Sequence, residues 1–149
     1  MSPTADLREA RVAAGLTQAK LAKRAGTSQS RLSSYENNRI TPNRSTRNRL
    51  LRATQRLPSE AIRENREEIL RSAQGNGLSD VRVFGSVARR SDTIHSDIDL
   101  LVTAQEGTSL MELAGFAAQV EDLTGFDVDV VSDGNISKDS EILREARSL

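Results

Sequence analysis

The chain has 149 residues, a formal net charge of zero and no cysteine. The lack of cysteine excludes disulfides and thiolate metal ligands, and no apolar run approaches the roughly 20 residues that cross a bilayer. Charged residues within the first ten positions exclude the apolar core of a secretory signal. We therefore expect a cytoplasmic protein without a membrane partner.

The two halves of the sequence carry opposite charge. Residues 1–57 hold 12 Lys or Arg and three acidic residues, a net charge of +9, whereas residues 58–149 hold nine basic and 18 acidic residues, a net charge of −9. Such asymmetry is typical of parts with separate partners. A basic half suits a polyanion, and an acidic half suits metal ions or a basic protein. We therefore predict two domains, residues 1–57 and 58–149; the alternative is two solvated faces of one domain.

The first half predicts a series of short helices. Thr17, a typical N-cap, and Gly26, a typical C-terminal cap, bracket a predicted helix over residues 18–25. A second predicted helix covers residues 29–36, and a further amphipathic helix runs up to Leu57. The short turn centred on Gly26 joins the helices over 18–25 and 29–36 in the helix-turn-helix arrangement.

This half resembles the Xre-type, lambda-repressor-like DNA-binding domain over about residues 6–57. The resemblance is carried by Arg11, Gly-Leu-Thr-Gln at 15–18, Leu-Ala at 21–22, Ala-Gly at 25–26, Leu-Ser at 32–33 and Tyr-Glu-Asn at 35–37. It implies operator DNA as a partner, bound by a dimer at a two-fold site, and an internal ion pair between Arg11 and Glu36. The alternative is a helical module that has lost DNA binding and serves in dimerisation or docking.

The same resemblance assigns DNA contacts to individual side chains. Gln18, at a helix N-terminus, would meet a DNA phosphate. The side chains that would face base edges in the major groove are Gln29, Ser30, Arg31 and Ser34. Glutamine pairs well with adenine, and arginine pairs well with guanine. The arginines that would hold the DNA backbone, and so fix the register without selecting a sequence, are Arg39, Arg44 and Arg47.

The second half alternates helices and strands. Its predicted elements are a helix over 59–73, a strand over 81–84, a short helix from Ser86, a strand over 97–103, a helix over 109–124, a strand over 126–131 and a helix over 138–147. This order predicts a small α/β layer of about three strands. The fold class expected for the whole chain is α+β with two domains: an all-α helix-turn-helix domain, then a small α/β domain with a mixed sheet of three strands or slightly more.

Two carboxylates and a Gly-Ser turn point to chemistry in this half. Asp97 and Asp99 begin a predicted strand two residues apart, so their side chains face the same side. Gly85 and Ser86 lie upstream, in a turn at a helix start whose backbone N–H groups suit a phosphate. Carboxylates beside a phosphate are the ligands that Mg²⁺ prefers. The pattern predicts a metal-dependent phosphoryl or nucleotidyl transfer site.

A third carboxylate from the strand over 126–131 would complete this site. Asp127 and Asp129 share one face of that strand, so periodicity alone does not choose between them.

The second half resembles the minimal nucleotidyltransferases of the DNA polymerase beta-like superfamily over about residues 60–149. The resemblance is carried by Gly-Ser-Val-Ala-Arg at 85–89, Ser-Asp-Ile-Asp-Leu-Leu-Val at 96–102 and Val-Asp-Val-Val at 128–131. It favours Asp129 as the third acid. It implies ATP as substrate and two Mg²⁺ ions, held as metal ligands and catalytic residues by Asp97, Asp99 and Asp129.

The resemblance also assigns nucleotide contacts. Gly85 would let the backbone approach the nucleotide, and Ser86 would donate to a phosphate. Arg89 would be either a phosphate contact or a member of an internal ion pair. Arg90 departs from the family pattern, which usually has glycine at this position; the loop would be less compact there, or gain a cation near the phosphates.

A DNA-binding domain fused to a minimal nucleotidyltransferase resembles an autoregulated antitoxin. In that resemblance the partner is a HEPN-type toxin, the antitoxin transfers AMP from ATP to a toxin tyrosine, and the helix-turn-helix domain represses the operon. The expected assembly is a homodimer or a hetero-oligomer with the toxin. The alternatives are a non-catalytic DNA-binding antitoxin that masks the toxin by complex formation, and a nucleotidyltransferase that acts on a small molecule.

Overall fold

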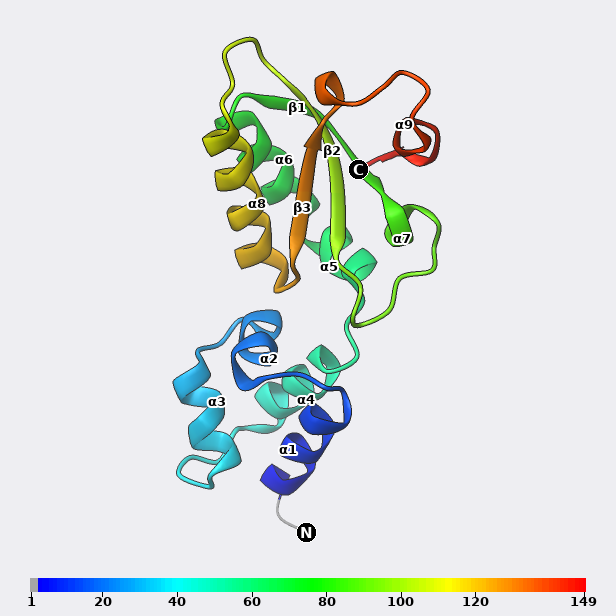
Figure 1. Ribbon diagram of the computed structural model, residues 1–149. Coiled ribbons are helices and arrows are strands. Elements are labelled where there is room, and N and C mark those ends of the chain that lie inside the picture. The colour runs from blue at the N-terminus through cyan, green and yellow to red at the C-terminus, as the bar shows by residue number, and fades with distance from the viewer. Residues whose placement is uncertain (1–2) are drawn as a thin grey trace. The chain divides into compact units, whose positions relative to one another are not determined.

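The computed structural model describes residues 3–149, with side chains from Asp6 onward. The chain divides into two compact units (Figure 1). Unit 1 ends at Arg56, and unit 2 covers Leu57–Leu149. Among the described residues, none of the helices combines the length and the apolar composition that a bilayer crossing requires.

Unit 1 contains four helices over its described residues: α1 (Pro3–Ala13), α2 (Gln18–Ala25), α3 (Gln29–Glu36) and α4 (Arg44–Ala53). Leucines from every helix meet in one core and are almost fully buried: Leu7, Leu21, Leu32 and Leu50. Burial of each such side chain contributes on the order of 2 kcal/mol. The predicted helices over 18–25 and 29–36 are confirmed, and the last helix ends at Ala53 rather than near Leu57.

Local caps explain where α2 begins and ends and where α3 begins. The Thr17 hydroxyl accepts a hydrogen bond from the Lys20 N–H, and Gly26 adopts φ +70°, the left-handed conformation that glycine reaches without strain. The Ser28 hydroxyl accepts from the Arg31 N–H at the start of α3. These caps fix the turn of the helix-turn-helix.

Unit 2 has an α/β fold. It begins with α5 (Pro58–Glu64) and α6 (Arg66–Gly75), and continues with β1 (Leu78–Phe84), α7 (Gly85–Ala88), β2 (Ile98–Ala104), α8 (Leu110–Thr124), β3 (Val128–Ser132), the 3₁₀ turn η1 (Asp133–Asn135), α9 (Glu141–Glu145) and β4 (Arg147–Ser148). The four strands form one sheet in the order β3-β2-β1-β4. β2 and β3 are parallel and the other pairs are antiparallel, so the sheet is mixed. The predicted fold class is confirmed.

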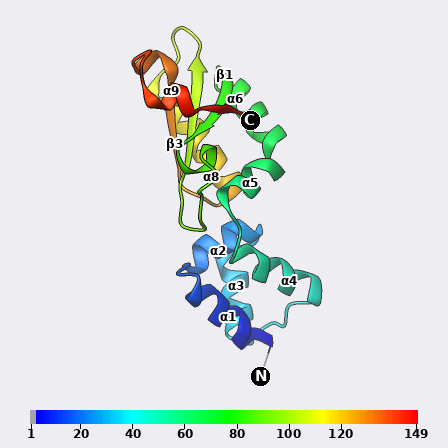
Figure 2. The ribbon, with the colours of Figure 1, turned by 90° about the vertical axis from the view of Figure 1, so that its right-hand side faces the viewer.

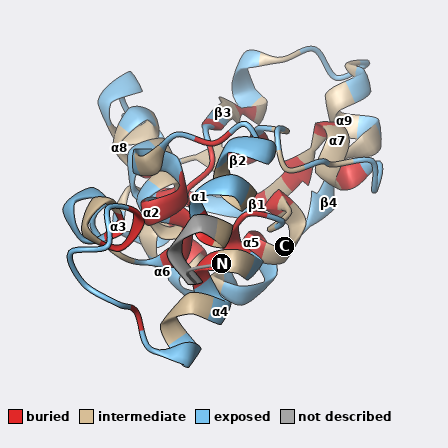
Figure 3. Ribbon diagram, turned by 90° about the horizontal axis from the view of Figure 1, so that it is seen from below, coloured by how far each residue is buried: buried red, intermediate tan, exposed pale blue. Residues whose placement is uncertain are grey.

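Helices α6 and α8 cover one face of this sheet (Figures 1 and 2). The β2 side chains on that face, Ile98, Leu100 and Val102, are fully buried and pack with Phe116 and Val120 of α8. Because side chains alternate along a strand, the residues between them face the other side. Figure 3 shows buried stretches in red along β1, and also along α2 of unit 1.

Two expectations for unit 2 are wrong. The helix predicted over 59–73 is two helices that meet at Asn65, whose side-chain amide donates to the Ala61 carbonyl; asparagine side chains compete with helical backbone bonds in this way. The helix predicted over 138–147 is confined to α9, and the chain then forms the short strand β4. Backbone pairing with β1 outweighs the local helical pattern there.

Candidate active site and DNA-binding surface

Two carboxylates lie side by side on the sheet face away from α6 and α8, and a third lies nearby. Asp99 is the second residue of β2 and lies directly opposite Asp129 of the parallel strand β3. Residues opposite one another in a sheet point to the same face, and Asp99 alternates with the core residues Ile98 and Leu100. Asp97 is exposed just before β2. The strand register therefore places Asp99 and Asp129 side by side, and Asp97 lies near enough for its charge to act on Asp99.

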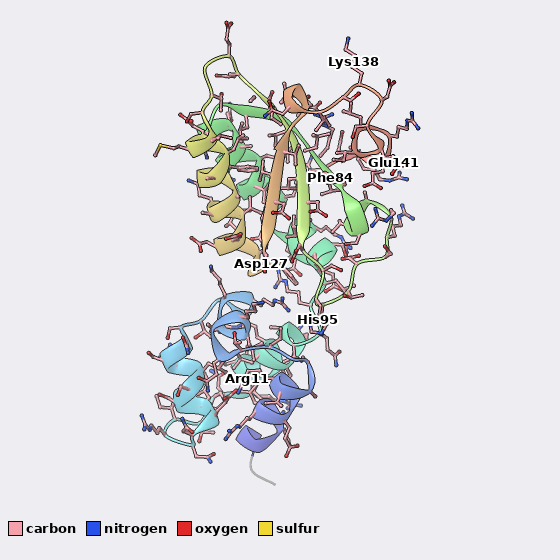
Figure 4. All side chains as sticks on the ribbon, viewed as in Figure 1. Arg11, Phe84, His95, Asp127, Lys138 and Glu141 are labelled. Carbon is pink, nitrogen blue, oxygen red and sulfur yellow. The ribbon has the colours of Figure 1, made fainter. Side chains whose placement is uncertain are left out.

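Asp127, the other acid that periodicity left open, lies immediately before the first residue of β3 (Figure 4). Its backbone carbonyl accepts the Ile98 N–H at 2.9 Å, and its side chain is exposed. Asp129, not Asp127, is the residue opposite Asp99.

The acidic cluster is electrostatically unfavourable in the absence of a cation. Burial raises the pKa of Asp99 above its ordinary value, and the nearby carboxylates of Asp129 and Asp97 raise it further. Arg89 acts in the opposite direction. A divalent cation would relieve this repulsion.

The carboxylates suit Mg²⁺ in their donor chemistry. Within residues 3–149 as described, no three His, Cys, Asp or Glu side chains already converge around a metal position. Mg²⁺ is usually bound by only one or two protein carboxylates, with phosphates and water completing its shell. Such a cluster of carboxylate oxygens fits an ion that arrives together with a nucleotide.

The Gly-Ser turn lies directly against this cluster. Gly85 follows β1 with φ +70° and begins the single-turn helix α7. A Cβ atom at this position would collide with the Asp99 carboxylate oxygen Oδ2. Any other residue would therefore be strained by the backbone conformation and would displace the Asp99 carboxylate. Ser86 is half-buried as the next residue of α7.

Glu145, which the sequence did not single out, binds the turn. Its Oε1 accepts the Gly85 N–H at 2.8 Å, and its Oε2 accepts Nη1 of Arg89 at 3.0 Å. The Gly85 N–H is the largest cause that lowers the pKa of Glu145, and Arg89 adds to it. Of the two roles left open for Arg89, the structure contains the internal ion pair. No local signal could reveal a contact between residues 60 positions apart in the chain.

The candidate DNA-binding residues lie in unit 1, on and after α3. Gln29, Ser30 and Arg31 are exposed, and Ser34 is half-buried. Leu32, Tyr35 and Glu36 take the buried side of the same helix. The backbone-holding candidates Arg39 and Arg44 are exposed, and Arg47 of α4 pairs with Asp6 at 3.1 Å.

The ion pair expected between Arg11 and Glu36 is present, with Arg11 Nε and Glu36 Oε1 2.6 Å apart. Gln18 joins it, because its amide Nε2 donates to Glu36 Oε2 at 2.7 Å. Burial opposes ionisation of Glu36, but these hydrogen bonds hold its pKa below the ordinary value. The phosphate contact assigned to Gln18 stays a prediction, since its amide nitrogen is engaged within the domain.

Comparison with known families decides the identity of unit 2. The polymerase beta nucleotidyltransferase family matches residues 67–148, more than half of the chain, and the helix-turn-helix family matches residues 7–60. The chain belongs to the polymerase beta nucleotidyltransferase family. It is a nucleotidyltransferase that carries an Xre-like helix-turn-helix domain at its N-terminal side.

Similar proteins place this nucleotidyltransferase among small members of the family. Two are named as candidate protein adenylyltransferases of Methanocaldococcus jannaschii. One is 36% identical over 75 residues, covering 50% of this chain and 81% of the relative; the other is 30% identical over 77 residues, covering 52% and 76%. A solved structure of a candidate minimal nucleotidyltransferase matches with 40% identity and a TM-score of 0.56, covering 61% of this chain and 95% of that chain.

The position where this nucleotidyltransferase departs from the usual glycine has a structural explanation. Arg90 adopts φ +59°, in the left-handed region that favours glycine, and its N–H donates to the Val87 carbonyl. The loop after α7 therefore keeps a glycine-type conformation although an exposed arginine occupies it. The side chain adds a cation at this edge of the turn.

Proposed function

We propose that this nucleotidyltransferase transfers AMP from ATP to a tyrosine of a partner HEPN-type toxin, and that its helix-turn-helix domain represses the operon that encodes both. The observation that carries the proposal is the register that sets Asp99 opposite Asp129, with Gly85 against Asp99. The names of the archaeal relatives support a protein as the acceptor.

The residues of the site would have different roles in this reaction. Asp97, Asp99 and Asp129 would hold two Mg²⁺ ions, which when bound neutralise charge on the triphosphate and activate the attacking hydroxyl. Gly85 keeps the Asp99 carboxylate accessible because it has no side chain. Ser86 donates its hydroxyl proton in a hydrogen bond to a phosphate oxygen.

The proposed transfer is a displacement at the α-phosphorus of ATP. The tyrosine oxygen forms a bond to that phosphorus, the bond to the bridging oxygen breaks, and pyrophosphate leaves. The tyrosine proton passes to the Asp129 carboxylate, which acts as general base. Most of the rate enhancement comes from positioning and from charge stabilisation.

A tyrosine acceptor belongs to another molecule. The sequence contains one tyrosine, Tyr35, and only 7% of it is exposed within the core of unit 1. Its hydroxyl is therefore a poor target for modification in the folded chain. This supports transfer in trans rather than self-modification of tyrosine.

The test is label transfer from α-labelled ATP with Mg²⁺ to the protein encoded by the neighbouring gene. We expect label on that protein, and no label when the enzyme carries Asp97→Asn with Asp99→Asn. Label on a small molecule instead would favour the small-molecule alternative. A stable complex without label would replace the proposal with a masking antitoxin.

The DNA-binding part of the proposal has a separate test. Unit 1 should protect a palindromic site upstream of its own gene, as a dimer with half-sites about one helical turn apart. A gel-shift with that upstream fragment, competed by unrelated DNA at fixed salt, measures the specificity. Equal affinity for both DNAs would contradict an operator.

A further inference from the structure

The helix that carries the Gly-Ser turn cannot hold its own position. α7 has four residues, from Gly85 to Ala88. One turn of helix gains too few hydrogen bonds to offset the cost of ordering the backbone. Contacts from elsewhere in the fold must therefore set where Gly85 and Ser86 lie relative to Asp99.

One carboxylate provides contacts at both ends of α7. Glu145 accepts the N–H of Gly85, the first residue, and the guanidinium of Arg89, the C-cap residue, at 2.8 and 3.0 Å. Both are charge-assisted hydrogen bonds, which are stronger than neutral ones. The Glu145 side chain is 27% exposed and that of Arg89 is 57% exposed, so the backbone contact is the better protected of the two.

The C-terminal strand fixes the position of Glu145. β4 pairs with β1 so that Ser148 lies opposite Arg82 and Arg147 opposite Val83. Gly85 follows Val83 by two residues and Glu145 precedes Arg147 by two, so this pairing brings Glu145 close to Gly85. The N–H of Leu149 also donates to the Val81 carbonyl at 3.2 Å. Strand β1 leads into the turn, and its partner strand β4 begins two residues after Glu145, which binds the turn.

We propose that Glu145 is a positioning residue for the nucleotidyl transfer. It holds the Gly85–Ser86 turn against the Asp99 carboxylate, so that a nucleotide on the turn meets the metal-binding acids at the reacting distance. Glu145 itself does not touch the reacting atoms. This inference rests on the proposed function for its kinetic consequence, whereas the clamp on Gly85 is measurable without it.

The opposite role for Glu145 is a placeholder that a phosphate must displace from the Gly85 N–H. The pairing of β4 with β1 opposes that role, because Glu145 could leave only if the strand or its own side chain rearranged. The two roles predict opposite effects of removing the carboxylate. Loss of a positioning residue slows the reaction, whereas loss of a placeholder strengthens ATP binding.

The first measurement is a comparison of variants of the full chain in the label-transfer assay. Glu145→Ala should lower kcat by about 10- to 100-fold, because a misplacement of about 1 Å has effects of this size, while KM for ATP changes by less than about threefold. Glu145→Gln keeps an oxygen that accepts the Gly85 N–H and loses the charge opposite Arg89, so it should recover most of kcat. Glu141→Gln removes the same charge from an exposed position of α9 (Figure 4) and should leave the kinetics unchanged.

The second measurement is amide hydrogen exchange at Gly85, which requires no activity. Exchange should accelerate in Glu145→Ala, stay near the wild-type rate in Glu145→Gln, and remain unchanged at Val83 in both variants. If circular dichroism shows that Glu145→Ala is unfolded, the wild type is compared instead with Arg89→Ala and with Glu145→Gln, which is nearly isosteric with the wild type.

The outcomes separate the two proposals. Wild-type kcat in Glu145→Ala, tighter ATP binding, or unchanged exchange at Gly85 would each overturn the positioning role. If the wild-type enzyme labels no acceptor, the proposed function fails, and the exchange measurement still decides whether Glu145 holds the turn.

Discussion

Glu36 in unit 1 and Asp99 in unit 2 are acids removed from full solvent contact, and the fold treats them in opposite ways. Glu36 receives hydrogen bonds from Arg11 and Gln18, and its pKa is lowered despite its burial. Asp99 is partly buried beside two further carboxylates, and its pKa is raised. Unit 1 uses its acid to hold helices together, whereas unit 2 keeps a repulsive cluster that only a bound cation would satisfy. The hydrogen-bonded carboxylate of Glu36 therefore indicates a structural role, and the carboxylate of Asp99, which lies among other acids, indicates a binding site for a cation.

The largest expected effect separates the two units by function. Asp97→Asn with Asp99→Asn should reduce transfer by at least about 10³-fold, since metal-assisted charge stabilisation supplies several kcal/mol. Operator affinity should not change. Parallel label-transfer and gel-shift assays make the comparison, and loss of DNA binding in this variant would contradict two separable units.

The next largest effect is expected when the ion pair between Arg11 and Glu36 is removed. Arg11→Ala leaves Glu36 buried without its ion-pair partner, which should destabilise unit 1 by about 3–5 kcal/mol. Because Tyr35 is the only tyrosine and the chain has no tryptophan, tyrosine fluorescence in a urea titration reports unit 1 selectively. Arg49→Ala, at an exposed position of α4, is the control. Equal midpoints for the two variants would show that the ion pair does not hold the helices.

A smaller effect is expected at the DNA-binding surface. Arg31→Ala should weaken operator binding by about 1–3 kcal/mol and relax the preference at one base pair if Arg31 contacts a guanine. Arg71→Ala removes the same charge from α6 of unit 2 and should leave the affinity unchanged. Unchanged affinity in Arg31→Ala, measured at fixed salt, would reject the contact.

The loop after α7 offers a stabilising change. Arg90→Gly should raise the stability of unit 2 by at most about 1 kcal/mol, because glycine adopts φ +59° without strain but gains more freedom in the unfolded chain. Thermal unfolding followed by calorimetry measures the shift. A lower melting temperature would mean that the arginine side chain stabilises the loop through its charge.

The smallest effect concerns pH, and it has opposite signs in the two units. The lowered pKa of Glu36 stabilises the folded state above pH 4.5, and this contribution is lost as the pH falls through the folded-state pKa. The raised pKa of Asp99 destabilises the folded state above that pKa, and the penalty disappears as the pH falls toward 3.8.

Two variants isolate these pH effects. As the pH falls below 4.5, the stability advantage of the wild type over Glu36→Gln should shrink. As the pH falls from neutral toward 3.8, the disadvantage of the wild type relative to Asp99→Asn should also shrink. Urea unfolding at a series of pH values, with one probe for each unit, makes the measurement. If lowering the pH changed the stability of the wild type relative to the two variants in the same direction, the contrast between the two acids would be contradicted.

Much of the molecule could be predicted from local patterns. Thr17 and Gly26 mark the ends of α2 because capping is a contact between neighbours in sequence. The alternation of acids and apolar residues predicts the strands at Asp99 and Asp129 because one face of each strand is buried. The break at Asn65 escaped prediction because it depends on one side chain competing with the backbone inside a helical pattern.

The sequence by itself determined that a basic helix-turn-helix precedes an acidic α/β domain, because charge, caps and strand periodicity are properties of short segments. The nucleotidyltransferase family of that domain came from the resemblance of its Gly-Ser and Asp-Ile-Asp motifs. Only the tertiary structure decided that Asp129 rather than Asp127 lies opposite Asp99, since this follows from the register between β2 and β3. It also decided that Glu145 binds Gly85, through a strand too short to be recognised before it pairs. Pairing between distant segments depends on backbone groups that every residue shares, so the sequence of either segment alone does not predict which partner it pairs with.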